Sequence, residues 1–180
     1  MCGQEPVAVP VFEVLRDEST IKFYVKASVA LEGSFAKWDA KLKFASAEAT
    51  SGALAIRIQA ASVDTGNGTK NKKLKGKDFF DAKRNPQITF VSRKVVQTGP
   101  TSLEVDGDFT IRGVTRPEKL ALSITGKGTG AGTIQGTMAF DRKDYGMTKG
   151  IPFVTIADRV EVTVNLKTRQ ISGSRLEYQQ

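Results

Sequence analysis

The sequence predicts an all-β domain, a barrel or sandwich of antiparallel strands with a single short helix. Apolar and polar residues alternate along most of the chain, as at Ile21, Phe23 and Val25, which is the period of a strand with one buried face. Short glycine-bearing links such as Thr98-Gly99-Pro100 separate these segments, as antiparallel hairpins require. Only residues 69–77 have the character of a helix.

Each further strand repeats this alternation and has one apolar face. Repeated one-faced strands with short links fit a barrel or sandwich, and a closed barrel also removes exposed edges. Gly33, Gly107 and Gly136 fall inside strand patterns, where a missing side chain permits a bulge or sharp bend. The other apolar positions are Leu42, Phe44, Leu54, Ile56, Ile58, Ile88, Phe90, Leu103, Val105, Phe109, Ile111, Leu120, Leu122, Ile124, Met138, Phe140, Val160, Val162, Val164 and Leu166.

The helix predicted over residues 69–77 has Asn67 or Thr69 available as N-cap and Gly76 near its C-terminal end. Pro86 prevents helix from continuing much further. The longest irregular connection is expected over residues 141–157, which contain two glycines and a proline. A connection of that length in a compact domain is often functional.

Composition excludes several classes of enzyme. The chain has 180 residues, which favours one domain, and it contains no His and one Cys. Without His there is no Ser-His-Asp or Cys-His catalytic unit and no imidazole-ligated metal, and one Cys makes neither an intrachain disulfide nor a multi-thiolate centre. We therefore expect no metal and no catalytic residues of these kinds. No stretch approaches the ~20 apolar residues of a membrane-spanning helix.

The net charge of +8 raises the question of an anionic partner. Most lysines and arginines, such as Lys22 and Lys26, alternate with apolar residues, which is typical of the solvated outer face of a sheet. We therefore expect no nucleic-acid partner. The densest run places five lysines in residues 70–77. It fits either a solvated helix surface or contact with an anionic membrane surface.

Four consecutive blocks between residues 61 and 90 resemble the YceI-like family, and the similarity covers about residues 12–167. Two further stretches, 107–115 and 141–146, resemble the family's glycine-bearing hairpin and its Asn-Arg-x-Asp-Phe-Gly motif. One departure is Lys26-Ala27-Ser28, where many members have a His, so no role of that His carries over. The four blocks are Ser62-Val63-Asp64-Thr65-Gly66-Asn67, Lys73-Leu74, Asp78-Phe79-Phe80-Asp81 and Asn85-Pro86-Gln87-Ile88-Thr89-Phe90.

The resemblance implies an extended antiparallel, lipocalin-like β-barrel with one short helix near the barrel end. This domain would span residues 12–168, between an N-terminal tether, 1–11, and a C-terminal tail, 169–180. The family also implies an apolar tunnel that holds a polyprenyl or quinone-like isoprenoid lipid, which the protein binds, sequesters or transports. It implies neither catalytic residues nor another cofactor. It does imply export from the cytoplasm, and a homodimer as a common assembly.

The inward apolar residues have two interpretations, because a filled core and a lipid cavity share one alternating pattern. The pattern alone favours a filled core, whereas the resemblance favours a tunnel, with Gly136 and Ala139 as small interior positions. We expect one of Phe79 and Phe80 to line the tunnel and the other to pack the helix. The expected ligand-binding residues are Ile21, Phe23, Val25, Phe44, Ile56, Ile58, Phe79, Phe80, Ile88, Phe90, Phe109, Ile111, Met138, Phe140 and Tyr145.

Asp64, Thr65, Arg142 and Tyr145 are candidates for polar contacts at the mouth, but the pattern favours turn or strand-end hydrogen bonding as the role of each. Two functions compete with lipid binding. One is an enzyme acting on such a lipid through Asp, Glu, Lys or Tyr, although no closely spaced carboxylate pair marks a site. The other is an interaction domain with a dry, filled core.

Cys2 follows Met1 directly and precedes the polar stretch Gly3-Gln4-Glu5-Pro6. If Met1 replaces a signal peptide, Cys2 is the lipidated first residue of a lipoprotein, and an incidental surface Cys is the alternative. We therefore expect an extracytoplasmic protein, either periplasmic or anchored to the membrane as a lipoprotein.

Overall fold

Eight strands close a ring in the order β1-β4-β5-β7-β8-β9-β10-β11, with β11 returning to β1. The computed structural model describes residues 8–179, and every pairing between its named strands is antiparallel. The predicted all-β barrel is therefore confirmed. The ring strands are β1 (Val11–Val14), β4 (Trp38–Phe44), β5 (Gly52–Gln59), β7 (Gln87–Gly99), β8 (Ser102–Ile111), β9 (Val114–Thr125), β10 (Ala131–Asp141) and β11 (Ile156–Ser172).

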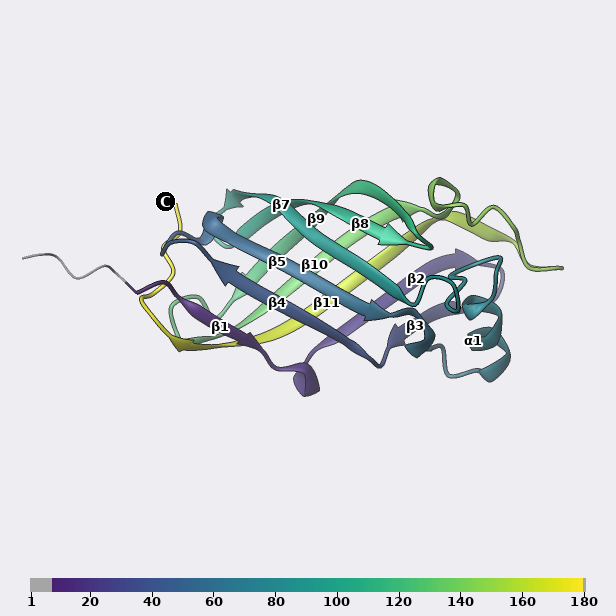
Figure 1. Cartoon of the computed structure of the whole chain (residues 1–180), viewed down its shortest axis with the longest axis horizontal. Coiled ribbons are helices and arrows are strands. Elements are labelled where there is room, and N and C mark those ends of the chain that lie inside the picture. The colour runs from purple at the N-terminus through teal and green to yellow at the C-terminus, as the bar shows by residue number, and fades with distance from the viewer. Residues whose placement is uncertain (1–7, 180) are drawn as a thin grey trace, which may run out of the picture.

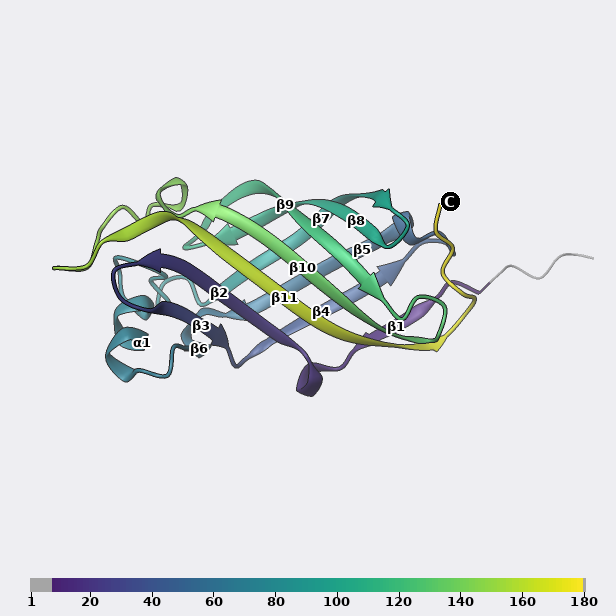
Figure 2. The same cartoon turned by 180° about the vertical axis from the view of Figure 1, so that it is seen from behind.

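The remaining elements extend the barrel at one end. β2 (Thr20–Ala27) pairs with the first half of β11, β3 (Leu31–Phe35) pairs with β2, and β6 (Val63–Asp64) pairs with β3. Helix α1 (Gly68–Lys75) lies at this end, and the described chain begins and finishes at the other (Figures 1 and 2). Short 3₁₀ turns are η1 (Arg16–Glu18), η2 (Ala49–Ser51), η3 (Ala60–Ser62) and η4 (Arg142–Tyr145).

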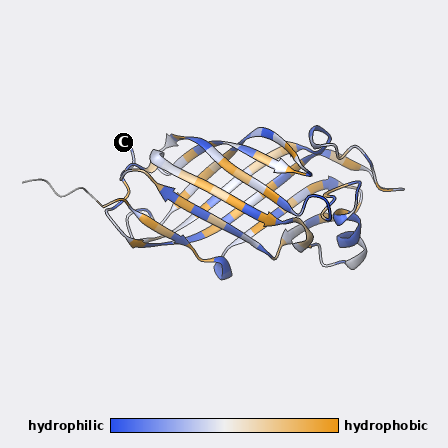
Figure 3. Cartoon of the chain, viewed as in Figure 1, coloured by the Kyte–Doolittle hydropathy of each residue, from blue (hydrophilic) through white to orange (hydrophobic). Residues whose placement is uncertain are grey.

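Side chains alternate between the interior and the solvent along the strands. In β8 every second residue is buried, including Leu103, Val105 and Phe109. Figure 3 shows the same alternation as bands of hydrophobic and hydrophilic colour along the strands. The barrel interior is therefore a single apolar space, since each strand directs one of its two faces into it.

The hairpin between β8 and β9 is one of the tight turns that the sequence predicts. Ile111 pairs with Val114, so Arg112 and Gly113 form a two-residue loop. Both have positive φ, +58° and +74°, which is the backbone of a type I′ turn. That turn twists in the same sense as the flanking strands, and therefore fixes the register of the pair.

Of the three glycines predicted at bulges or bends, one lies beside a bulge and two do not. Gly107 lies opposite a bulge in β7, between Ser92 and Lys94, as predicted. At Gly33 and Gly136 the strand pairing continues without a shift in register. There the missing side chain makes room for neighbours instead: a Cβ on Gly136 would lie 2.5 Å from Val164 Cγ2.

Helix α1 begins and ends close to the predicted residues. Asn67 Oδ1 accepts a hydrogen bond from Lys70 N at 3.0 Å, so Asn67 is the N-cap, and Gly76 is the C-cap. Leu74 is the buried residue of this helix and anchors it to the barrel end. The helix is otherwise polar, and its lysines face outward or are partly covered.

The terminal segments are more ordered than the tether and tail expected from the sequence. Arg169 to Ser172 belong to β11, and Pro10 is buried. Ser174 N donates to Ala8 O at 2.9 Å, which ties the two segments together. Polar composition concealed this order, because the pairing is made by backbone groups. Residues 1–7 of the expected tether lie outside the described residues.

The close contact at Gly107 gives a prediction about stability. A Cβ there would lie 2.5 Å from Phe90 Cζ and 2.7 Å from Val91 O. Gly107→Ala should therefore lower the free energy of unfolding by about 1–3 kcal/mol through overpacking. The matched control is Gly68→Ala, where a Cβ has no atom within 4 Å and stability should stay equal or rise. Urea unfolding of both variants provides the measurement; equal stabilities would contradict this account of Gly107.

Candidate functional site

Three apolar cavities follow one another along the barrel. We name them the terminal, middle and helix cavities. The space in them that the centre of a water molecule can occupy is about 80, 30 and 60 Å³, respectively. The terminal cavity lies near the chain ends and is lined by Phe44, Leu103 and Leu176, among others. The helix cavity is lined by Leu74 of α1 and by Phe79 and Phe80, which follow the helix.

The lining of these cavities favours an apolar guest over water. A single water needs ~10–15 Å³ of such space, so every cavity is large enough for one. However, Thr89 is the polar residue of the middle cavity lining and Arg142 that of the helix cavity lining. A buried water needs two to four polar partners, and these two walls offer few. The terminal cavity is lined mainly by apolar residues but also by polar ones such as Lys127 and Thr168.

Side chains connect the three cavities. Ile58, Phe109 and Val162 line both the helix and the middle cavity. Gly136 marks the other junction, because a Cβ there would contact Leu122 of the terminal cavity and Val164 of the middle cavity. The three cavities are thus neighbours along the barrel, with side chains of the strands between them.

Two aromatic clusters line the helix end of the interior. The rings of Phe23, Phe35 and Phe80 lie 5.6–6.4 Å apart between centroids. The ring centroids of Phe109 in β8 and Phe140 in β10 lie 5.0 Å apart. Tilted and edge-on arrangements of this kind are the favourable ones for aromatic side chains, so the walls are well packed.

Fourteen of the fifteen residues expected at the ligand site line one of the three cavities; the exception is Tyr145. All but Phe44 are buried. Ile21, Ile56, Phe90 and Met138 line the middle cavity; Phe23, Val25, Phe79, Phe80, Ile88, Ile111 and Phe140 line the helix cavity; Ile58 and Phe109 line both; Phe44 lines the terminal cavity.

Tyr145 is completely buried beside the aromatic wall. Its ring lies edge-on to Phe109 and Phe140 at 5.5 and 5.3 Å, and its hydroxyl donates to Glu118 Oε1 at 2.8 Å. Burial and, next, this hydrogen bond raise the pKa of Tyr145 well above its ordinary value. Tyr145 therefore stays protonated and supports the wall from behind.

Two expectations about which way side chains face were wrong. Ala139 lies between the inward Met138 and Phe140 and so points to the outer surface, where it contributes to a shallow depression with Lys119. Phe79 and Phe80 both face the helix cavity, because they lie in a series of turns after α1 and not on a strand. Strand alternation does not apply to such a segment.

The polar residues assigned to the mouth have local structural roles. Asp64 is exposed and its Oδ1 accepts from Gly66 N at 2.8 Å, whereas Thr65 donates to Asn71 Oδ1 at 2.7 Å. These are turn and helix-entry hydrogen bonds. Neither residue lines any of the three cavities.

Arg142 is buried at the edge of the helix cavity and holds the connection between β10 and β11. Its Nη1 donates to Met147 O at 2.6 Å and to Lys149 O at 2.9 Å, and its Nε donates to Ala157 O at 3.2 Å. Its Nη2 lies 3.5 Å from Asp158 Oδ1. The guanidinium thus fixes the loop that forms part of the cavity wall.

The C-terminal segment contributes to the site, which the sequence did not indicate beyond a lone Leu in a polar stretch. Leu176 and Tyr178 line the terminal cavity. Tyr178 lies under Lys127 Nζ, 4.2 Å from the ring centroid, and burial raises the pKa of its hydroxyl. Gln97 Nε2 donates to Gln179 O and holds the segment against β7.

Within residues 8–179, no three His, Cys, Asp or Glu side chains are grouped so that they could hold a metal ion. The same part of the chain contains no helix that is both long and apolar enough to cross a bilayer. Cys2, the expected lipidation site, lies outside the described residues.

Solved structures of similar shape include BcnA from Burkholderia cenocepacia, which is 31% identical with a TM-score of 0.78 over 86% of this chain and 99% of that one. A domain from Saccharophagus degradans, described as polyisoprenoid-binding, is 14% identical with a TM-score of 0.70 over 90% of this chain and 99% of that one. At this identity the second likeness concerns the fold alone.

A similar protein is the UPF0312 protein of Ectopseudomonas mendocina, 31% identical over 127 residues. The match covers 67% of this chain and 66% of the relative, so it spans about two thirds of each. The profile of the YceI-like domain matches residues 12–168, from β1 almost to the end of β11. The chain therefore belongs to the YceI-like family.

Proposed function

We propose that the protein binds an isoprenoid-type lipid, a polyprenyl or quinone-like molecule, along the inside of its barrel. The observation that carries this proposal is the series of three apolar cavities, which follow the barrel and are separated by side chains alone. A long, narrow, branched hydrocarbon matches such an interior better than a compact ligand does. The polyisoprenoid-binding domain with the same fold supports the proposal.

The energetics of burial favour a chain lipid. At ~0.8 kcal/mol for each buried CH₂ group, a five-carbon unit contributes on the order of 3–4 kcal/mol before ordering costs. The cavities are small, so a bound chain displaces the side chains between them, including Ile58, Phe109 and Val162. Loss of their packing offsets part of the gain, and the affinity should therefore rise less than proportionally with chain length.

Binding without a chemical step is the form of the proposal that the site supports best. The chain contains no His, and Tyr145 is a buried, protonated hydroxyl that does not line the cavities. The protein would then sequester or transport its lipid, and it would need no cofactor. An enzyme acting on the lipid would require a reactive group at a cavity wall. Arg142, at the helix cavity, is committed to backbone carbonyls. At the terminal cavity, Lys127 lies over the ring of Tyr178, and burial raises the pKa of the Tyr178 hydroxyl.

The proposal extends to where the protein works. We place it in the bacterial cell envelope, exported by a signal peptide and either periplasmic or anchored through a lipidated Cys2. A homodimer, which the family resemblance implies, belongs to the same proposal.

Filling the channel at a junction should abolish lipid binding. Val162 is partly buried and lines the helix and middle cavities, so Val162→Trp should block the passage between them. We expect lipid retained by the purified protein to fall about tenfold or more while the melting temperature changes little. Solvent extraction with mass spectrometry measures retention, and thermal unfolding measures stability.

The matched control is Thr163→Trp, on the same strand but facing the solvent. It should retain lipid as the wild type does. In a dry-cored interaction domain the outcome is reversed: Val162→Trp would strain a filled core by about 1–3 kcal/mol, and no lipid would be present to lose. Equal retention by both variants would place the lipid outside the barrel.

Lipidation of Cys2 is tested in the full-length parent protein expressed with its own leader. Wild type should incorporate labelled fatty acid and fractionate with membranes, whereas Cys2→Ala should do neither, since acylation needs the thiol. Labelling that persists in Cys2→Ala would contradict the lipoprotein assignment. Lipid retention by the barrel should be equal in the two proteins.

A further inference from the structure

The connection between η4 and β11 ends in a fully exposed aromatic side chain. Phe153 has a relative exposure of 107%, whereas every other exposed large hydrophobic residue of the described chain is at or below 58%. In Figures 1 and 2 this loop, coloured yellow-green, extends beyond α1 and is the outermost part of that end of the barrel. Phe153 therefore contributes no packing to the fold.

The backbone conformation at position 153 disfavours a bulky residue such as Phe. Val154 N donates to Ile151 O at 3.1 Å, which closes a four-residue turn with Pro152 and Phe153 at its centre. Phe153 has φ +64°, at the position where a type II turn normally has Gly or Asn. A bulky residue disfavoured by the local backbone and without tertiary contacts points to a partner outside the chain.

The loop is anchored on both sides, so the ring is held outward. Arg142 Nη1 binds Met147 O and Lys149 O on one side. On the other, Ser28 N donates to Thr155 O at 2.9 Å and Thr155 N donates to Ser28 Oγ at 3.0 Å. Phe153 thus projects from a fixed base.

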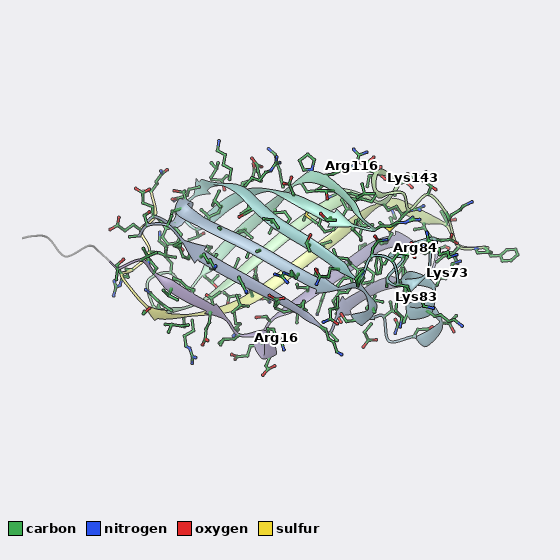
Figure 4. All side chains as sticks on the ribbon, in the orientation of Figure 1. Arg16, Lys73, Lys83, Arg84, Arg116 and Lys143 are labelled. Atoms are coloured by element: carbon green, nitrogen blue, oxygen red, sulfur yellow. The ribbon has the colours of Figure 1, made fainter. Side chains whose placement is uncertain are left out.

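Basic residues lie at the same end of the barrel as this apolar tip. Lys70 Nζ donates to Ala30 O at 2.7 Å, which places α1 beside the β2–β3 turn that anchors the loop, and exposed Val29 lies in the same turn. Residues 68–77 contain five lysines and no acidic residue. Figure 4 shows Lys73, Lys83 and Arg84 gathered at the same end. Asp78 at this end pairs with Lys73, and Asp158 pairs with Arg142 and Lys143, whereas the exposed Glu32 and Asp64 take part in no ion pair among the described residues and partly offset the positive charge.

The same loop is also a wall of the helix cavity. Met147 and Ile156, on either side of Phe153 in sequence, line that cavity together with Arg142. The exposed ring, the lysines and one end of the apolar interior therefore occupy the same end of the barrel.

We infer that this end docks on an anionic lipid bilayer, with Phe153 inserted among the acyl chains and the α1 lysines against the head groups. An exposed aromatic tip with a lysine-rich helix at the same end of the barrel has the pattern of an interfacial anchor, and the charge of that helix is complementary to an anionic membrane. The barrel axis then points at the membrane, and the helix cavity is the entrance for cargo. This role in cargo uptake rests on the proposed function; docking itself does not.

Co-sedimentation with vesicles tests the docking surface. Wild type should bind vesicles of phosphatidylglycerol and phosphatidylcholine more tightly than pure phosphatidylcholine, and high salt should weaken the binding. Phe153→Ser should lower the partition coefficient on anionic vesicles about tenfold, the effect of one buried aromatic side chain. The control is Ile171→Ser, which removes an exposed apolar side chain from β11 at the opposite end.

A second pair of variants separates local charge from net charge. Lys72→Glu with Lys75→Glu on α1 should lower anionic vesicle binding at least about tenfold. Lys22→Glu with Lys41→Glu changes the net charge equally on the barrel wall and should have a much smaller effect. Phe153→Trp should blue-shift its fluorescence on anionic vesicles, against the constant background of the buried Trp38.

The vesicle-binding experiments can fail or succeed independently of the test of lipid binding inside the barrel. Phe153→Ser should retain cargo in solution as the wild type does, because its side chain lines none of the cavities. Equal vesicle binding by wild type and Phe153→Ser would overturn the inference. A change of oligomeric state in Phe153→Ser without any vesicle binding would overturn it too, in favour of contact with a second copy. Docking by a wild type that carries no lipid would support the inference and contradict the proposed function.

Discussion

Closure of the strand ring is the constraint on which the rest of the structure depends. β1 is only four residues long, yet it pairs with β11 through four residues and meets β4 at Val11 and Lys43, which completes the ring. Once the ring is closed, every second residue of each strand has to face the interior. The size of the inward side chains then decides where space remains, and Gly136, between Leu122 and Val164, shows how one missing side chain shapes that space.

The alternation of apolar and polar residues was sufficient to predict the strands and most of the cavity lining. Successive residues of a strand point to opposite faces. Once Lys22 faces the solvent, Ile21, Phe23 and Val25 must therefore face inward. Helix α1 could also be predicted from the sequence, since Asn67 and Gly76 are local capping signals. In each of these cases the physical cause acts over a few neighbouring residues.

The errors arose where the cause is not local. Ala139 is the exception, because it was assigned inward on size alone although local alternation with its neighbours Met138 and Phe140 already places it outward. Phe79 and Phe80 lie in turns held by backbone hydrogen bonds to the end of α1, such as Phe80 N to Leu74 O at 2.9 Å, and strand alternation does not describe such turns. The C-terminal segment is polar, and its place over the terminal cavity depends on pairing with Gln97, far away in the sequence. Arg142 has the structural hydrogen-bonding role that the sequence favoured, but its particular partners, the carbonyls of Met147 and Lys149, are brought together only in the folded loop.

The central claim is that the three cavities become one channel when a chain lipid is bound. A crystal structure of the protein loaded with a quinone that carries a polyprenyl tail tests this most directly. The account predicts continuous ligand density from the helix cavity past Val162 to the middle cavity, with Ile58 and Phe109 turned aside and all strand pairings unchanged. Ligand density confined to the outer surface, with these side chains in their present positions, would contradict it.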